Sequence, residues 1–171
     1  YRSVKYRQYE HRDFRTPSRK VELYSKTLEE LGQDPLPTHR ESQESPVSAP
    51  ALAREYPLIL TTERSLFQFH TGTMTRKVEG LNQLRGSELV EMNPQDAGKL
   101  GIGSGDLVSV ASRRGEVEAK ALITEVCPPG VISMTFHFTE SPTNIVTNFA
   151  RDPVSKIPEL KVCAVKVEKV K

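Results

Sequence analysis

The sequence has no tryptophan, only two cysteines and no long hydrophobic segment, and each shortage excludes a class of protein. No apolar run approaches the roughly 20 residues that a membrane-spanning helix needs, so we expect no membrane insertion. Cys127 and Cys163 lie in apolar, strand-like surroundings, and neither has a CxxC partner or a histidine at metal-ligand spacing. We therefore predict two buried structural thiols and no metal site, in a core built from Val, Ile and Leu.

An excess of charge of one sign is also missing. The net charge of +2 is too small to indicate a nucleic-acid partner. The first twenty residues are basic, with seven Lys or Arg against two Asp or Glu, and form either a solvated arm or an anion-binding patch. No secretory signal is visible, so we expect a cytoplasmic location. Export is the alternative, because the chain begins with Tyr1 rather than Met.

The sequence that is present divides near residue 55. Residues 32–50 are polar, rich in Pro and Ser, and without periodicity, which is typical of an extended connector. Ahead of them, KVELYSKTLEELG (20–32) indicates a short strand that runs into a helix ending at Gly32. We therefore predict an N-terminal arm and connector over residues 1–55 and a globular domain over residues 56–171.

The second part consists of short apolar strands separated by turn signals. The segment NPQDAGKLG predicts one short helix, with Asn93 as N-cap, Pro94 at the first helical position and Gly101 closing it. Arg114 and Gly115 predict a hairpin turn. This spacing favours a mainly β, closed barrel capped by a helix, and we see no repeated unit. The predicted strands are YPLILTT (56–62), SELVEMN (87–93), DLVSVAS (106–112), EVEAKALIT (116–124), VISMTFHF (131–138) and LKVCAVKVE (160–168).

Two motifs that suggest catalysis or nucleotide binding are incomplete. GIGSGD (101–106) lacks the following helix and lysine of a phosphate-binding loop, so it indicates a tight turn. No carboxylate is spaced to form a hydrolytic triad with His70, and no serine lies in a GxSxG elbow, so we predict no catalytic residue here. His137 lies opposite the apolar face of its strand, where it faces either solvent or a ligand cleft.

Polar side chains gather after the first strand. Thr61 and Thr62 offer hydroxyls, and Arg64 offers a bidentate guanidinium. In the following FQFHTGTMTR (67–76), Gly72 allows close backbone approach. These groups suit phosphate and sugar binding, or they form a polar loop that covers one end of the barrel.

A second polar set follows the strand at 131–138. SPTNIVTN (141–148) places Asn144, Thr147 and Asn148 after that strand. The amides either read donor and acceptor patterns on heterocycles or cap a helix or turn. Lys156 and Lys161 flank a proline and are either ligand cations or exposed loop charges.

These segments, in this order, resemble the C-terminal domain of the molybdopterin oxidoreductases, and most of all the large (alpha) subunit of formate dehydrogenases. Arg19 and Leu160 stand where the family often has Gly and Tyr. The resemblance covers nearly everything from Phe14 to Glu168 except the connector. It is carried by TPSRKVELYS, FQFHTGTMTR, VEMNPQDAGKLGIGSGDLVSVASRRGEVEAKALIT, PPGVISMTFHF, TNIVTN and DPVSKIPELKVCAVKVE.

The resemblance implies a double-psi β-barrel with short capping helices that holds one molybdopterin guanine dinucleotide, carrying molybdenum or tungsten. The full subunit would oxidise formate to CO2, and its metal ligand and iron–sulfur cluster would lie in other domains, so this fragment alone is expected to be inactive. The implied cofactor-binding residues are Thr61, Thr62, Arg64, His70, Thr71, Gly72, Thr73, Asn144 and Lys161.

The implied partners are the remaining domains of the same catalytic subunit and electron-transfer subunits. Three alternatives stay open. The same domain occurs in nitrate reductase-like members of the family. A double-psi barrel can also be a non-catalytic interaction module. A self-processing decarboxylase with a related barrel would cleave at a Gly-Ser bond such as Gly86–Ser87 or Gly103–Ser104.

Overall fold

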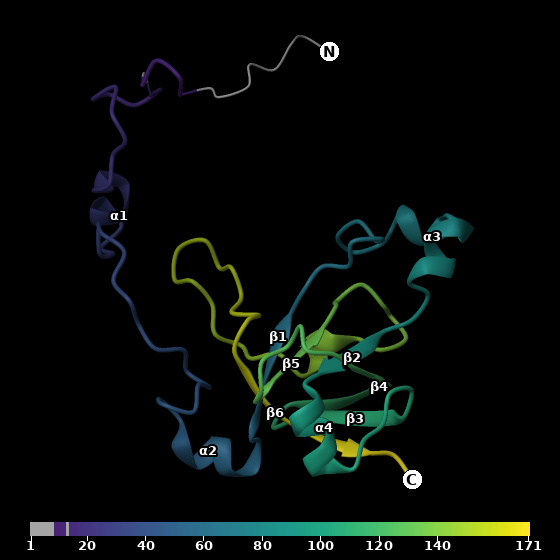
Figure 1. Cartoon of the computed structure of the whole chain (residues 1–171). Coiled ribbons are helices and arrows are strands. Elements are labelled where there is room, and N and C mark those ends of the chain that lie inside the picture. The colour runs from purple at the N-terminus through teal and green to yellow at the C-terminus, as the bar shows by residue number, and fades with distance from the viewer. Residues whose placement is uncertain (1–8, 13) are drawn as a thin grey trace. The chain divides into compact units, whose positions relative to one another are not determined.

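The computed structural model describes residues 9–12 and 14–171 (Figure 1), so the basic segment over residues 1–20 lies partly outside the described residues. The chain forms two compact units, Tyr1–Arg40 and Glu41–Lys171. In the first unit, α1 (Lys26–Glu30) begins where the Ser25 side chain accepts a hydrogen bond from the amide of Leu28. Residues 20–24, which we expected to form a strand, are irregular.

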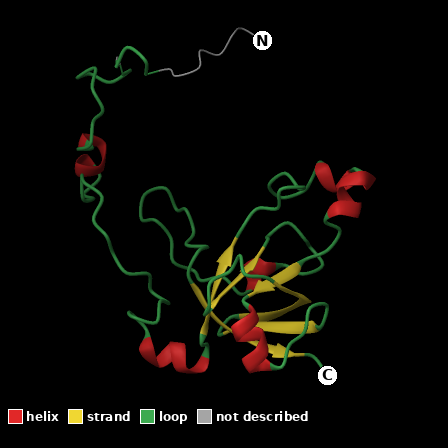
Figure 2. Ribbon diagram, in the orientation of Figure 1, coloured by secondary structure: helices red, strands yellow, loops and turns green. Residues whose placement is uncertain are grey.

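The second unit is a closed barrel of six strands (Figure 2). Around the barrel the order is β1-β5-β2-β4-β3-β6. The pairs β1–β5 and β2–β4 are parallel, and the other four pairs are antiparallel. The strands are β1 (Leu58–Thr62), β2 (Leu89–Met92), β3 (Leu107–Ser112), β4 (Gly115–Ile123), β5 (Val131–Met134) and β6 (Cys163–Lys169).

The pairing scheme has an internal two-fold symmetry. Exchanging β1, β2 and β3 for β4, β5 and β6 leaves every pairing and its direction unchanged. Two equivalent halves therefore interlock through the parallel pairs β1–β5 and β2–β4. This is the arrangement of a double-psi β-barrel, so the predicted mainly β fold is confirmed.

Alternate residues of the strands fill the barrel interior with aliphatic, methionine and cysteine side chains. The chain has no tryptophan to place there. Both cysteines are buried and free, which confirms the prediction of structural thiols, and burial raises the pKa of each. Fully buried members of the core include Leu60, Val90, Met92, Val108, Val110, Ile132, Met134 and Val165.

The predicted helix forms as α4 (Pro94–Leu100). Asn93 Oδ1 accepts from the amide of Gln95 at 3.0 Å, and Gly101 has a φ of 66°. Four other short helices were not predicted: α2 (Pro50–Glu55), α3 (Glu79–Leu84), and the 3-10 turns η1 (Thr75–Lys77) and η2 (Thr143–Ile145). None of the helices over the described residues is long and apolar enough to span a bilayer.

Two strand boundaries differ from the prediction. Ser112 pairs with Gly115, so the hairpin turn consists of Arg113 and Arg114, one residue earlier than expected. The strand β5 ends at Met134, four residues before the predicted end at Phe138. The segment that follows β5 therefore leaves the barrel wall and becomes part of a loop.

The direction of each strand determines at which end of the barrel the next connection lies. The connections 63–88, 113–114 and 135–162 lie at one end, which we call the loop end. The helices α2 and α4 and the turn 124–130 lie at the opposite end (Figure 1). The long connections thus project from one side of the barrel only.

Candidate functional site

All nine residues predicted from the sequence lie at the loop end, because both predicted polar sets follow strands that end there. Two of them are bonded directly. The Lys161 ammonium donates to the carbonyl oxygen of Thr62, and the Thr62 amide and hydroxyl donate to Leu160 O at 3.1 Å and 3.0 Å. The end of β1 is therefore joined to the segment that leads into β6.

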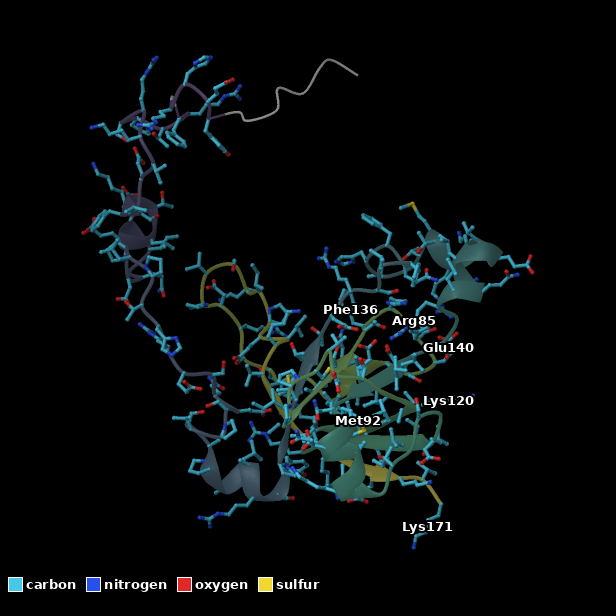
Figure 3. All side chains as sticks on the ribbon, in the orientation of Figure 1. Arg85, Met92, Lys120, Phe136, Glu140 and Lys171 are labelled. Atoms are coloured by element: carbon cyan, nitrogen blue, oxygen red, sulfur yellow. The ribbon has the colours of Figure 1, made fainter. Side chains whose placement is uncertain are left out.

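The loop 67–76 lies as a layer over the segment that follows β5. The His70 ring meets the ring of Phe136 edge-on at 5.4 Å. The Arg76 guanidinium lies 5.0 Å from the centre of the Phe138 ring and forms an ion pair with Glu140 at 2.5 Å. Figure 3 shows Phe136 and Glu140 on the loop-end side of the barrel. These contacts connect residues 70–76 to the segment that follows β5.

Gly72 lies at the centre of this layer and has a φ of 70°. A Cβ atom there would lie 2.9 Å from Cγ and Cδ of Arg76 and 3.5 Å from Cδ2 of His137. A side chain here is therefore disfavoured by the backbone conformation, and it would also require the Arg76 side chain to shift. The glycine between the two threonines allows the loop to pack on its own protein.

His137 does not face solvent or a ligand cleft, as the sequence suggested. Its residue is 4% exposed, it lies beneath Gly72, and its ring centre is 4.1 Å from that of Phe138. Nε2 is buried and has no hydrogen-bond partner. Burial and the charges of Arg76 and Arg85 lower the pKa of His137, so the neutral imidazole is the form that the site favours.

The rest of the 63–88 connection is held by two amides that sequence reasoning missed, the buried Gln68 and the half-buried Asn82. Gln68 accepts from the Thr75 hydroxyl at 2.7 Å and donates to Asn82 Oδ1 at 3.2 Å and to Arg85 O at 3.3 Å. Asn82 in turn donates to Arg76 O at 2.7 Å. These bonds tie α3 to the layer described above, so the connection has a defined shape.

A buried carboxylate anchors the same connection to Thr135, the residue directly after β5. Glu88 accepts from the Thr135 amide at 3.1 Å and from the Thr135 hydroxyl at 2.6 Å. Burial raises the pKa of Glu88, and the guanidinium of Arg85 lies 3.9 Å away. No local pattern in the sequence marks this contact, because the two residues are far apart along the chain.

Among the predicted site residues, the side chains that remain exposed at the loop end are two cations, two hydroxyls, one imidazole and one amide. Arg64 and Asn144 are exposed, and the hydroxyls of Thr71 and Thr73 are 3.0 Å apart on the surface. Asn148 has a different environment, since it is buried and its amide donates to Val162 O at 2.9 Å. Asn148 Oδ1 also accepts from the amide of Ala150 at 2.8 Å, so the turn-capping interpretation applies to Asn148. The exposed Arg64, Asn144, Thr71 and Thr73 are free to meet a ligand.

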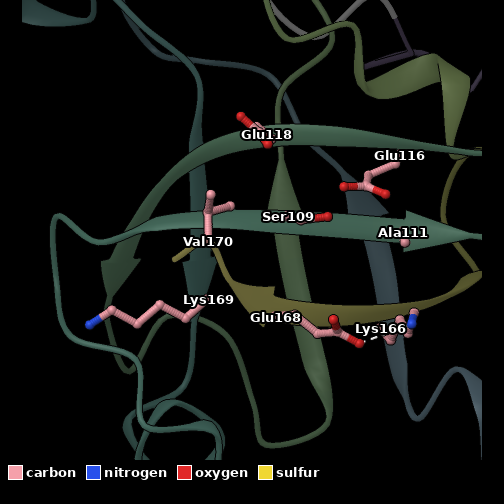
Figure 4. Close-up of a pocket in the computed structure, with 8 residues that line it drawn as sticks. All are labelled: Ser109, Ala111, Glu116, Glu118, Lys166, Glu168, Lys169 and Val170. Carbon is pink, nitrogen blue, oxygen red and sulfur yellow. Dashed lines mark hydrogen bonds and ion pairs between the residues drawn. The ribbon is translucent and has the colours of Figure 1, made fainter.

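Two grooves elsewhere on the barrel suit an anionic ligand less well. One, of about 250 Å³, crosses β3, β4 and β6 and is lined by three carboxylates and two ammonium groups (Figure 4). The other, of about 630 Å³, lies at the opposite end beside α2 and α4. It is lined by three cationic and three anionic side chains and by no Ser, Thr, Asn or Gln. Over the described residues, no three His, Cys, Asp or Glu side chains gather as a metal site would require.

The fold and the exposed donors together define a barrel whose one end can hold a polar, anionic molecule. Residues 58–164 match the model of the molydopterin dinucleotide binding domain, and the chain belongs to this family. The match includes every predicted site residue, from Thr61 to Lys161.

The chain is also similar to individual proteins. It is 54% identical over 117 residues to the F420-dependent formate dehydrogenase subunit alpha of Methanocaldococcus jannaschii, which is 68% of this chain and 17% of that protein. It is 43% identical to the periplasmic nitrate reductase of Desulfovibrio desulfuricans over 67% of this chain and 15% of that protein. The structure of acetylene hydratase from Pelobacter acetylenicus superposes with a TM-score of 0.79 at 27% identity, covering 91% of this chain and 24% of that one. The chain thus spans less than a quarter of these relatives.

Proposed function

We propose that the loop end holds one molybdopterin guanine dinucleotide within the catalytic subunit of a formate dehydrogenase. The observation that carries the proposal is the placement of all the exposed donors of two separate loops at one end of a barrel of the dinucleotide-binding family. The similarity to formate dehydrogenase alpha subunits, at 54% identity, favours formate as the substrate of the complete subunit.

The residues present fit this cofactor chemically. A diphosphate carries negative charge, which the exposed Arg64 and Lys161 offset. The hydroxyl pair of Thr71 and Thr73 and the amide of Asn144 supply neutral donors and acceptors for sugar and heterocycle edges. When bound, the cofactor supplies two-electron chemistry at its molybdenum or tungsten, and the protein binds and orients it. The chain alone is expected to be inactive.

Apolar side chains at the loop end support a second part of the proposal, which is that the remaining domains of the subunit dock there. Leu66 is 92% exposed on one loop and Phe149 is 78% exposed on the other, and exposed apolar groups that gather on one face mark interaction surfaces. Electron-transfer subunits would bind elsewhere on the complete enzyme, and a cytoplasmic location stays a prediction. Others in this set are Phe69, Met74, Leu84 and Ile157.

A nitrate reductase is the second candidate, supported by the 43% identity to the periplasmic enzyme. The two candidates share the cofactor and differ in the substrate and in the direction of electron flow. Assaying the complete subunit with formate and an electron acceptor, and with nitrate and an electron donor, separates them. We expect turnover of formate only.

The cofactor assignment is tested by Arg64→Ala and Lys161→Ala in the complete subunit. Each removes a cation from the loop end, so we expect molybdenum and guanine content to fall severalfold after purification. Lys99→Ala is the matched control, because Lys99 is an exposed lysine at the opposite end of the barrel. Unchanged cofactor content in both loop-end variants would exclude the assignment.

A further inference from the structure

A buried ion pair fastens the connector to the loop end. The side chain of Glu44, which precedes the barrel in sequence, is 1% exposed, and that of Arg114 in the β3–β4 turn is 6% exposed. The guanidinium binds the carboxylate with both terminal nitrogens, and Nη2 lies 3.0 Å from Oε2. Glu44 Oε2 also accepts from the amide of Ala164 in β6 at 3.0 Å. One carboxylate thus joins the connector, the hairpin turn and β6.

Arg114 extends the same contact to the turn that carries Asn144. Its Nη2 donates to Val146 O at 2.7 Å, directly after η2. The neighbouring Gly115 packs so closely against Ile145 that a Cβ atom at Gly115 would collide with it. Residues 143–146 therefore rest on the β3–β4 hairpin through one hydrogen bond and one close contact.

The chemistry of the Glu44–Arg114 ion pair suits the positioning of neighbouring groups better than it suits simple stabilisation of the fold. Burying two charges costs several kcal/mol per ion, and apolar residues of similar size often stabilise a fold equally well. A guanidinium, unlike an apolar group, can bind a carboxylate and a carbonyl in fixed directions at the same time. Although burial alone would raise it, the pKa of Glu44 is lowered by Arg114, the Ala164 amide and Arg113, so Glu44 is charged at neutral pH.

We infer that Glu44 and Arg114 are positioning residues for the cofactor-binding loop, holding Asn144 and the start of β6 in the arrangement that the cofactor meets. The inference rests on the proposed function for its purpose. It assigns a role at the site to Glu44, a residue of the connector.

The test compares cofactor retention with stability in the complete subunit. Arg114→Lys keeps a positive charge beside Glu44 but loses the fork that also reaches Val146 O. Glu44→Gln keeps an acceptor for Ala164 and removes the charge. Val110→Ala is the control, because Val110 is a fully buried core residue of β3 and takes no part in these bonds. For each protein, the midpoint of thermal unfolding and the rate of guanine dinucleotide loss are measured.

If the ion pair positions the cofactor-binding loop, Arg114→Lys and Glu44→Gln should lose the cofactor at least fivefold faster than Val110→Ala does. The comparison is made at an equal decrease in unfolding midpoint. The inference would be overturned if the rate of cofactor loss depended on the unfolding midpoint in the same way for all three variants. The pair would then act only by stabilising the fold.

Two further measurements separate this inference from the proposed function. In the cofactor-free chain, Arg114→Lys should speed hydrogen exchange at residues 143–148 at least fivefold more than Val110→Ala does, and equal exchange would overturn the positioning role. In the complete subunit, Asn144→Ala should also lose the cofactor faster. Normal retention by Asn144→Ala, together with altered exchange in Arg114→Lys, would contradict the proposed contact of Asn144 with the cofactor and leave the mechanical coupling established.

Discussion

At the scale of single residues, the loop end is organised around Gly72 and His137, whose ring lies where a Cβ atom at Gly72 would come within 3.5 Å of it. The left-handed backbone of Gly72 brings residues 70–76 down onto the segment after β5, and the neutral imidazole fills the space beneath. The sequence placed Gly72 in a binding loop because glycine permits close approach. It could not show that His137 of the same chain lies beneath this glycine, since that approach joins two loops.

Gly72→Ala is expected to destabilise the chain by about 1–2 kcal/mol, because the residue has positive φ and a Cβ atom would meet the Arg76 stem. Gly98→Ala is a control of opposite sign. It lies within α4 with free space around it, so alanine there should stabilise by roughly 0.5–1 kcal/mol. Urea denaturation measures both values. Equal effects at the two positions would contradict the described backbone conformation.

His137 predicts a pH-dependent stability. Its folded-state pKa is lowered below the ordinary 6.5, so the unfolded chain binds the proton more readily and the contribution of His137 falls as pH falls below about 6.5. His137→Phe removes the titrating group and the unpaired Nε2. The difference in unfolding free energy, variant minus wild type, should therefore increase between pH 7 and pH 5. Denaturation at several pH values measures it, and a difference that stays constant with pH would refute the burial of a neutral imidazole.

At the scale of elements, local signals predicted what local physics determines. The helix α4 has an N-cap, a proline at the first position and a closing glycine, and it forms where Asn93 to Gly101 predicted. The helices α2 and α3 lack a side-chain cap and bury none of their residues, so Pro50 at the start of α2 is the main local signal that the sequence offers for them. The strand β5 was predicted too long because its alternation continues past Met134, where the backbone turns out of the barrel wall.

The connection 63–88 depends on one buried amide. Gln68→Leu removes the partners of the half-buried Thr75 and Asn82, and an unpaired group costs up to about 1–3 kcal/mol when it is fully buried. We expect faster proteolysis within residues 66–84 at unchanged hydrogen exchange in the barrel strands. Gln83→Leu is the matched control on the exposed surface of α3. Equal proteolysis of the two variants would show that the connection does not rely on Gln68.

At the scale of the whole molecule, a symmetric barrel carries asymmetric connections. The exchange of halves relates the connection 63–88 to the turn 124–130, and the connection 135–162 to the segment 93–106 that contains α4. In both cases the longer member lies at the loop end. The sequence shows no repeat because the symmetry resides in backbone pairing, which constrains only the alternation of apolar residues.

The same asymmetry explains which part of the site could be predicted. Glycine, hydroxyls and cations in FQFHTGTMTR and around Asn144 marked the two long connections, and the resemblance to a family assigned them a common ligand. The long-range contacts that shape them, from Glu44, Gln68 and Glu88, carry no local signal and required the fold.

Hydrogen exchange of the complete subunit with and without its cofactor tests the central claim most directly. We predict that residues 61–76 and 142–161 gain protection of at least tenfold when the pterin dinucleotide is bound, while residues 94–105 and 124–130 at the opposite end are unchanged. Protection confined to the opposite end, or no change at the loop end, would contradict the assignment of the cofactor to these loops.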